Sequence, residues 1–384
     1  MIQRNPNMED KEVHRGLVGI VMNSTEITSV DGQNGVLLHR GYNIHELANH
    51  STFEETAYLL LYGELPTQSE LDGFSSALKA NRNIPGKVVD LIHDFKDGHP
   101  MDVLRTAVSA LSTFDTYGRN DNSLEVTLER GIRLISQMPT IVMHHQNIRQ
   151  GLDPIQPNES LDHAANFLYM MNGNLPSRDT ARLMDIDFIV HADHDVNASS
   201  TAARVAGGTK ANLYEAVTAA IATLDGPAHG GAAEDVMKMV MEIGEPENAV
   251  AYIQSVLDGK RRVTGFGHRV YKFEDPRARH LERSVQKLSQ EVEDQMLYEV
   301  LKAVQEKMEP LKERGIYPNV DFFAGVAYYL MGFSPDMFVP IFAVGRIPGW
   351  TVQFIEQIKD DILIRPLSRY EGPSERPYVP ISQR

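Results

Sequence analysis

The chain has no cysteine among its 384 residues. This absence excludes disulfide bonds, a thiolate nucleophile and cysteine-ligated zinc, and it is compatible with a reducing cytosol. Positive charge is scarce as well, because 37 Lys and Arg side chains stand against 52 Asp and Glu side chains, for a formal net charge of −15. Binding to a phosphate backbone needs concentrated positive charge, so we do not expect nucleic acid as a partner.

The chain also lacks an uninterrupted apolar run long enough to cross a membrane. Its longest apolar stretch, 322–344, is broken by Ser334, Pro335 and Asp336. The segment 1–15 is polar and charged, unlike the apolar core of a secretory signal. With 42% hydrophobic and 23% charged residues, the chain is predicted to be a cytoplasmic globular protein without a membrane span. It is long enough for more than one domain.

Helical periodicity dominates the apolar pattern. Only 28–39 is typical of strands, with Asp31-Gly32 and Asn34-Gly35 as hairpin turn signals. The segment 124–148 contains a proline at 139, so it is either one kinked helix or two helices. The sequence therefore predicts an all-α fold with a minor N-terminal β-hairpin. Helices are expected after the capping-box pattern of 67–70 and over 103–114, 124–148, 161–171, 211–224, 232–243 and 322–331.

Two histidines lie in glycine-rich phrases, Gly226-Pro-Ala-His229-Gly-Gly and Gly265-Phe-Gly-His268. Glycine lets the backbone come close to a ligand. A third phrase, Pro318-Asn-Val-Asp321, adds a carboxylate. Two imidazoles and one carboxylate suit proton abstraction and proton donation near neutral pH, so these phrases predict an acid–base active site.

His229 and Asp321 each allow a structural and a chemical interpretation. His229 precedes the helix expected from 232, and a helix N-terminus disfavours imidazolium. It is therefore either a neutral hydrogen-bond donor to a developing oxyanion or a capping or core histidine. Asp321 is either the N-cap of the helix that follows or a poorly solvated base beside Phe322 and Phe323.

The segment 260–280 reverses the acidic average, with seven basic residues against two acidic ones, or a net +5. It is either a solvated helix face or, around Gly265-Phe266-Gly267, a loop that holds phosphates. The arginines Arg277, Arg346 and Arg365 follow or precede proline or glycine phrases. Singly each is structural or exposed, whereas together they would form a clamp for a di- or tricarboxylate.

The phrase His191-Ala-Asp-His194 has two open interpretations. Two histidines three residues apart could bind a metal together with further ligands. Alternatively, His191 hydrogen-bonds an anionic substrate, while Asp193 and His194 hold the surrounding backbone.

Taken together, these phrases resemble the citrate synthase family, in the same order and over nearly the whole chain. The length is similar to that of the shorter archaeal and Gram-positive type. The phrases that carry the resemblance are Val30–Gly32, Arg40–Tyr42, His191–His194, Gly226–Gly231, Gly265–Lys272, Asp275–Ala278, Pro318–Asp321, Gly345–Trp350 and Ile364–Pro366.

The resemblance implies an all-α homodimer with two domains per subunit. A large domain at 1–225 and 328–384 would hold an inserted small domain at 226–327, which binds CoA and carries catalytic residues. The C-terminal arm would pack on the partner subunit. The family condenses acetyl-CoA with oxaloacetate, in the tricarboxylic acid cycle, to give citrate and CoA. It uses no metal and no cofactor beyond the CoA thioester substrate.

The resemblance also implies a role for each matching residue. Asp321 removes a methyl proton of acetyl-CoA, His229 donates to the enol or enolate oxygen, and His268 polarises and protonates the oxaloacetate carbonyl. Oxaloacetate would be held by His191, Arg277 and Arg346, with Arg365 from the neighbouring subunit. The CoA contacts would be Arg261, Arg262, Val263, Gly265, Phe266, Gly267 and Lys272.

Three departures from common family phrases occur, and none removes a catalytic position. Val352-Gln353 stands where many relatives carry Ala-His, Leu38-His39-Arg40 where Tyr-Arg is common, and Asp195 where Glu is frequent. The related 2-methylcitrate synthases share the catalytic phrases and use propionyl-CoA, so that activity or a dual specificity is the alternative. A metallohydrolase built on His191 and His194, or a non-catalytic acyl-CoA-binding protein, would represent other classes.

Overall fold

The computed structural model describes residues 12–384. Its sheet is a small antiparallel one in the order β1-β2-β3, with strands Thr28–Asp31, Val36–His39 and Tyr42–Asn43. Thr28 pairs with His39 and Asp31 with Val36, so the turn signals fall at the tip of the hairpin. The predicted hairpin is confirmed, and the short third strand is an addition that the sequence did not signal.

The rest of the described chain is built from helices, which confirms the all-α prediction. The first half contains α2 Ile44–His50, α3 Phe53–Tyr62, α4 Gln68–Ala80, α5 Gly86–Asp94, α6 Pro100–Leu111, α7 Leu124–Arg149, α8 His163–Asn172 and α9 Arg178–His191. The second half contains α10 Ala198–Gly208, α11 Leu213–Leu224, α12 Ala232–Ile243, α13 Ala249–Asp258, α14 Ala278–Glu291, α15 Met296–Met308, α16 Asp321–Leu330 and α17 Phe338–Asp360.

Local signals and packing together explain where the helices begin and continue. Thr67 and Glu70 form the expected capping box at the start of α4. Helix α7 is a single helix that runs through Pro139. A proline costs a helix one hydrogen bond, but most side chains of α7 from Leu134 to Ile148 are buried. Tertiary packing of this segment therefore holds the helix together across the proline.

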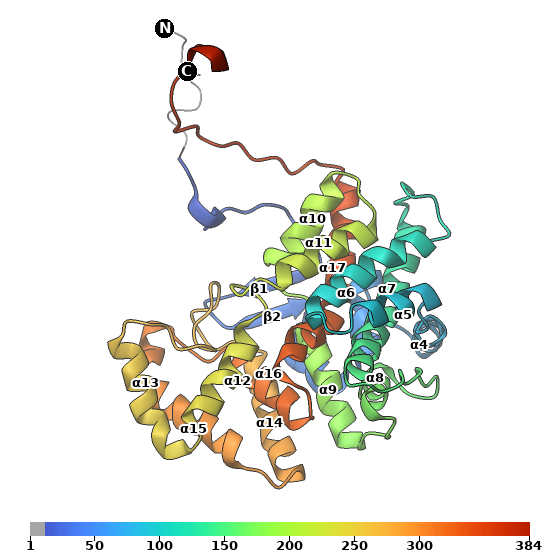
Figure 1. Cartoon of the computed structure of the whole chain (residues 1–384). Coiled ribbons are helices and arrows are strands. Elements are labelled where there is room, and N and C mark those ends of the chain that lie inside the picture. The colour runs from blue at the N-terminus through green and yellow to red at the C-terminus, as the bar shows by residue number, and fades with distance from the viewer. Residues whose placement is uncertain (1–11) are drawn as a thin grey trace.

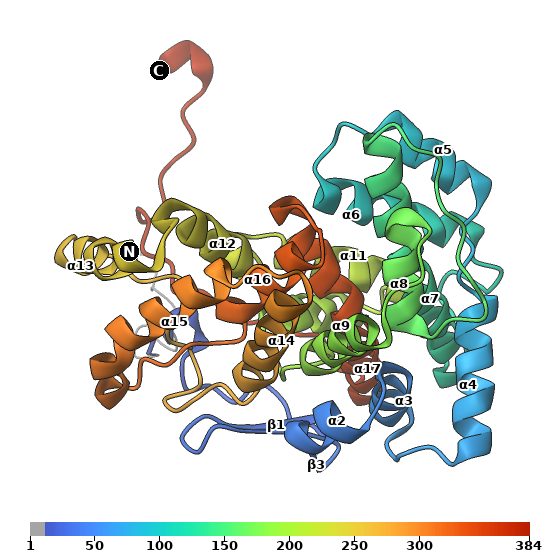
Figure 2. The same cartoon turned by 90° about the horizontal axis from the view of Figure 1, so that it is seen from below.

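The helices form two groups on either side of a central set. Figures 1 and 2 show α4 to α8 on one side and α12 to α16 on the other, with α9, α11 and α17 between them. Helix α16 packs against both α12 and α14. This second group corresponds to much of the predicted small domain, whose boundaries at 226 and 327 remain a prediction.

Helix α17 is the central helix of the core. The segment Pro335–Asp360 is long and apolar enough to cross a membrane, but 89% of its apolar window is buried inside the protein. It is therefore a core helix. After α17 the chain leaves the packed helices as an extended arm, as Figure 1 shows for its red end. The arm contains only a short 3-10 turn, at Ile381–Gln383.

Candidate active site

His268 lies in an irregular loop between α13 and α14. Its Nδ1 atom accepts hydrogen bonds from the backbone amides of Val270 and Tyr271, at 3.1 and 3.2 Å. Burial, followed by the charge of Arg277, lowers the pKa of His268 to about 4. An amide can only donate, so the ring is neutral at pH 7 and carries its proton on Nε2. Nε2 is therefore available as a hydrogen-bond donor.

The tip of the β1-β2 hairpin packs against the loop that contains His268. The carbonyl of Gly32 accepts from the Lys272 amide at 2.8 Å. A Cβ atom on Gly32 would lie only 2.4 Å from the Val270 carbonyl oxygen, and one on Gly35 only 2.6 Å from that of Glu274. The two turn glycines therefore serve a second purpose, because they let the hairpin touch the backbone of the His268 loop.

His229 occupies the turn between α11 and α12. Its Nε2 atom accepts from the Ser199 amide at 3.3 Å and lies 2.9 Å from the Ser199 hydroxyl oxygen, which also accepts from Trp350 Nε1 at 3.1 Å. The proton is therefore on Nδ1. Burial, followed by Arg346, lowers the pKa of His229 to about 4. The neutral ring agrees with one of the two interpretations of the sequence, but burial is the main cause of the lowered pKa, whereas the sequence argument relied on the helix N-terminus.

Asp321 is the first residue of α16, where Val320 is the N-cap and no side chain caps the helix. The carboxylate has no hydrogen-bond partner within residues 12–384, while Phe322 and Phe323 beside it are buried. Burial raises the pKa of Asp321, and the positive charge of Arg277 opposes the rise. The capping interpretation is therefore wrong, and the carboxylate has the poor solvation that strengthens a base.

Backbone pairing joins the His268 loop to the segment that leads into Asp321. The Gly267 amide donates to the Tyr317 carbonyl at 2.8 Å, and the Asn319 amide donates to that of Gly265 at 2.9 Å. Gly265 has a φ of +80°, and a Cβ atom there would clash with Phe322 at 2.8 Å. Two phrases that lie fifty residues apart are thus held as one unit by their glycines.

Two buried arginines lie close to these groups. Arg277 pairs with Asp275 through two hydrogen bonds, at 2.9 and 2.8 Å. Arg346 of α17 donates to the carbonyl of His191, and its guanidinium lies 4.7 Å from the centre of the Phe342 ring. Burial lowers the pKa of Arg346 to about 10. Both side chains therefore stay cationic at pH 7 and suit the binding of carboxylates.

His191 and His194 lie in different environments. His191 donates from Nδ1 to the Asp187 carbonyl at 2.9 Å, and its ring lies 4.6 Å from Phe342. The ring of His194 lies 5.3 Å from that of His268, and its Nε2 is 3.0 Å from the Tyr271 hydroxyl. Arg277, His268 and Arg346 all lower the pKa of His194, after burial.

His194 thus lies beside His268 and is affected by the charges of Arg277 and Arg346, which are groups expected to bind oxaloacetate. The sequence identified the phrase that contains it, but interpreted His194 either as a metal ligand or as a residue that holds the backbone. Its spacing from His191 does not indicate which of the two rings faces the site.

The metal hypothesis for His191 and His194 finds no support in the structure, since no group of three or more metal-ligating side chains forms within residues 12–384.

The predicted CoA and arginine positions divide into buried and exposed ones. Val263 and Gly265 are buried and Phe266 and Gly267 half-buried, in the loop that joins Asp321 to His268. Exposed positions are Arg261, Arg262 and Lys272, and also Arg365 on the C-terminal arm. Arg365 therefore lies beyond α17 and is not brought to the site of its own chain.

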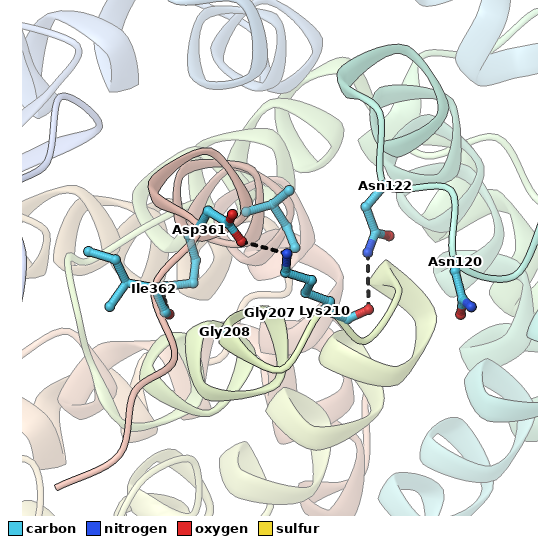
Figure 3. Close-up of a pocket in the computed structure, with 9 residues that line it drawn as sticks. Asn120, Asn122, Gly207, Gly208, Lys210, Asp361 and Ile362 are labelled. Atoms are coloured by element: carbon cyan, nitrogen blue, oxygen red, sulfur yellow. Dashed lines mark hydrogen bonds and ion pairs between the residues drawn. The ribbon is translucent and has the colours of Figure 1, made fainter.

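A hollow of about 310 Å³ lies elsewhere, between the ends of α10 and α17. Figure 3 shows that Lys210 pairs with Asp361, at 2.9 Å, and that Asn122 donates to the Lys210 carbonyl, at 3.2 Å. None of the candidate catalytic residues lines it. The acid–base chemistry thus belongs to the cluster around His268 and not to this hollow.

Comparison with known proteins extends over nearly the full chain. The family model for the C-terminal domain of citrate synthase matches residues 16–367. Citrate synthase of Haloferax volcanii is 40% identical over 378 residues, covering 97% of this chain and 99% of that protein. 2-Methylcitrate synthase 1 of Corynebacterium glutamicum is also 40% identical, over 385 residues that cover 98% and 100%.

The fold agrees with the same family. Citrate synthase from the thermophilic archaeon Thermoplasma acidophilum has been solved as a ternary complex with carboxymethyl coenzyme A and oxaloacetate. It matches with a TM-score of 0.92 at 32% identity, over 97% of this chain and 100% of that one. The resemblance seen in the sequence is therefore confirmed: the chain belongs to the citrate synthase family.

Proposed function

We propose that this protein is a citrate synthase, an acyltransferase that condenses acetyl-CoA with oxaloacetate and water to give citrate and CoA. The observation that carries the proposal is the hydrogen bonding of three groups that share Arg277 or Arg346 as a charged neighbour. In His229 and His268 one ring nitrogen accepts from a backbone amide, so the other carries a proton that no partner within residues 12–384 takes, while the Asp321 carboxylate lies beside buried phenylalanines. Enolisation and carbon–carbon bond formation need two hydrogen-bond donors and one base.

The first step is removal of a methyl proton from acetyl-CoA. Asp321 takes this proton, and its raised pKa makes it a stronger base than an exposed aspartate. Negative charge then develops on the thioester oxygen. His229 donates from Nδ1 to that oxygen and remains neutral, because Nε2 is already an acceptor for Ser199.

In the second step the enolate carbon attacks the keto carbon of oxaloacetate. His268 donates from Nε2 to the keto oxygen and passes its proton to it as the new bond forms. Arg277 and Arg346 bind the carboxylates, and water then hydrolyses citryl-CoA. This water returns a proton to His268, and the methyl proton held by Asp321 leaves when the site resets. We include His194 among the oxaloacetate contacts, because its ring lies against His268. The variant His194→Ala should therefore raise the oxaloacetate KM more than His191→Ala does.

The remaining features of the proposal concern the assembly and its setting. We infer a cytoplasmic homodimer of the tricarboxylic acid cycle, with Arg365 contributed across the interface and no metal or cofactor beyond CoA. Exposed apolar residues on the arm support burial against a partner; they are Ile362, Leu363, Leu367, Tyr370, Tyr378 and Ile381. The loop 261–267 with Lys272 would hold the CoA nucleotide.

The second candidate function is 2-methylcitrate synthesis from propionyl-CoA. It is favoured by the relative from Corynebacterium glutamicum, which is as similar to this chain as the Haloferax citrate synthase. One extra methylene in an apolar pocket changes discrimination by only about 1–3 kcal/mol. Few side chains around the acyl group would therefore decide between the two substrates.

A thiol-release assay with oxaloacetate tests both functions. We expect a higher kcat/KM with acetyl-CoA than with propionyl-CoA. A preference for propionyl-CoA would replace the citrate assignment by the methylcitrate one. If neither thioester releases thiol, the protein is not an enzyme of this kind.

A further inference from the structure

One face of α17 lies against the segment 191–199, which carries His191 and His194. Arg346, Gly349, Trp350 and Gln353 follow the spacing that places residues on one side of a helix, and all four are buried. Arg346 and Trp350 donate hydrogen bonds to this segment, and Gly349 touches its backbone. Gln353 is the fourth member of this face, and it has no role in the proposed mechanism.

The Gln353 amide joins two buried groups of opposite charge. Its Nε2 atom donates to the Asp193 carboxylate, at 3.4 and 3.2 Å to the two oxygens. Its Oε1 atom accepts from Arg204 Nε at 2.6 Å. All three residues are fully buried. A carboxylate can only accept and a guanidinium can only donate, so the two partners determine the orientation of the amide.

Asp193 influences the candidate site in two ways, through its charge and through the backbone that it holds. Its carboxylate lies against Gly349, where an added Cβ atom would meet Oδ1 at 2.7 Å, and Gly349 follows Arg346 by three residues on α17. The charge of Asp193 also favours the charged form of the buried Arg346 guanidinium. The carboxylate also accepts from the Asp195 amide at 3.1 Å, so it holds the backbone that presents His194. Loss of the Gln353 donor would leave this buried carboxylate short of a partner, which favours its protonation or displacement.

The Oε1 side of Gln353 is held by the buried Arg204 and its ion-pair partner. Arg204 of α10 forms an ion pair with Glu356, which lies about one helical turn after Gln353 on α17. Glu356 also accepts a hydrogen bond from the Glu26 amide at 3.0 Å. The Arg204–Glu356 ion pair therefore fixes the side of the Gln353 amide that faces away from Asp193. The amide supplies a hydrogen-bond donor to Asp193 without placing a further charge near Arg346.

We propose that Gln353 is a positioning residue for oxaloacetate binding, which acts through Asp193 on Arg346 and His194. It touches no substrate. The inference rests on the proposed function, because it gives Arg346 and His194 the role of oxaloacetate contacts. It concerns binding of one substrate only and leaves the acetyl-CoA side of the site unchanged.

The test compares Gln353→Met with Gln357→Met. Gln357 is a matched control, since it is a buried glutamine one turn further along α17 whose Nε2 donates to the Ile362 carbonyl at 2.8 Å. For Gln353→Met we expect an oxaloacetate Kd, measured by calorimetry, and an oxaloacetate KM that both rise about tenfold, the effect of one lost bond to a charged group. The acetyl-CoA KM should stay unchanged. Gln357→Met should lower thermal stability without altering either KM.

The variant Gln353→Glu is the second arm, in case the methionine variant does not fold. It keeps an acceptor for Arg204 but sets a second carboxylate against Asp193, so oxaloacetate binding should again weaken. Wild-type oxaloacetate affinity in a folded Gln353 variant would overturn the proposal, as would an equal rise in both KM values. Absence of turnover in the wild type would instead reject the proposed function, whereas calorimetry still reports on Gln353.

Discussion

The Ser199 amide donates to Nε2 of His229 at 3.3 Å, and the Ser199 hydroxyl oxygen lies 2.9 Å from the same atom. The amide can only donate, so the first contact assigns the imidazole proton to Nδ1. The tautomer of the proposed oxyanion donor is therefore set by a residue thirty positions earlier in the chain, at the start of α10.

Ser199→Ala should lower kcat, because it removes the hydroxyl beside Nε2 while keeping the amide that defines the tautomer. One buried hydrogen bond corresponds to about 1 kcal/mol, so we expect a loss of about five- to tenfold, with the oxaloacetate KM unchanged. Ser200→Ala is the control, since Ser200 is equally buried and its hydroxyl accepts from Asn197 instead. Equal kcat values in the two variants would contradict the role of Ser199.

Asp321→Asn should abolish turnover, because an amide cannot accept the methyl proton. A loss of general-base catalysis is expected to be at least 10²-fold. Oxaloacetate affinity, measured by calorimetry, should stay near the wild-type value, since Asp321 is assigned to the acetyl group. Wild-type rates in this variant would refute the assignment of the base.

Gly32→Ala should damage catalysis from outside the site. The added Cβ atom would meet the Val270 carbonyl at 2.4 Å, so either the hairpin or the His268 loop must move. We expect kcat to fall at least tenfold and stability to fall by about 1–3 kcal/mol. Gly73→Ala provides the contrast, because nothing lies within 4 Å of a Cβ there and alanine favours the helix. A Gly32→Ala enzyme with normal kcat would show that the hairpin contact is dispensable.

Buried histidines predict a loss of stability in acid. The pKa of His163 is lowered from 6.5 to about 3, first by burial and then by Arg82. Between these values only the unfolded chain binds the proton, so this contribution to stability is full above pH 6.5 and falls as the pH drops toward 3. The loss amounts to about 2 kcal/mol near pH 5 for this one residue.

Replacing this histidine should therefore flatten the pH dependence. The ring of His163 packs against Phe53 and Phe188, so His163→Phe keeps an aromatic neighbour without a titrating group. Thermal midpoints measured from pH 7.5 to 5 should fall less in this variant than in the wild type. His50→Gln, at an exposed position, should leave the slope as it is. Identical slopes in all three proteins would mean that His163 does not titrate as described.

The sequence alone determined much of the fold, because its strongest signals are local. The capping box at Thr67, the hairpin turns at Gly32 and Gly35 and the helical periodicity each act within a few residues. The continuity of α7 through Pro139 was decided only by tertiary packing, since burial of its second half outweighs the lost hydrogen bond.

The same division holds for the candidate site. The glycine-framed phrases identified His229, His268 and Asp321 from the sequence, because residue type and neighbours are local properties. The tertiary structure alone decided their proton states, the position of His194 beside His268 and the link from Gln353 to Asp193. The tautomer of His268 depends on the amides of Val270 and Tyr271, which are close in the chain. The other features depend on burial and on partners that lie between 30 and 160 positions away in the chain, and no local pattern encodes which distant donor or charge will face a given ring.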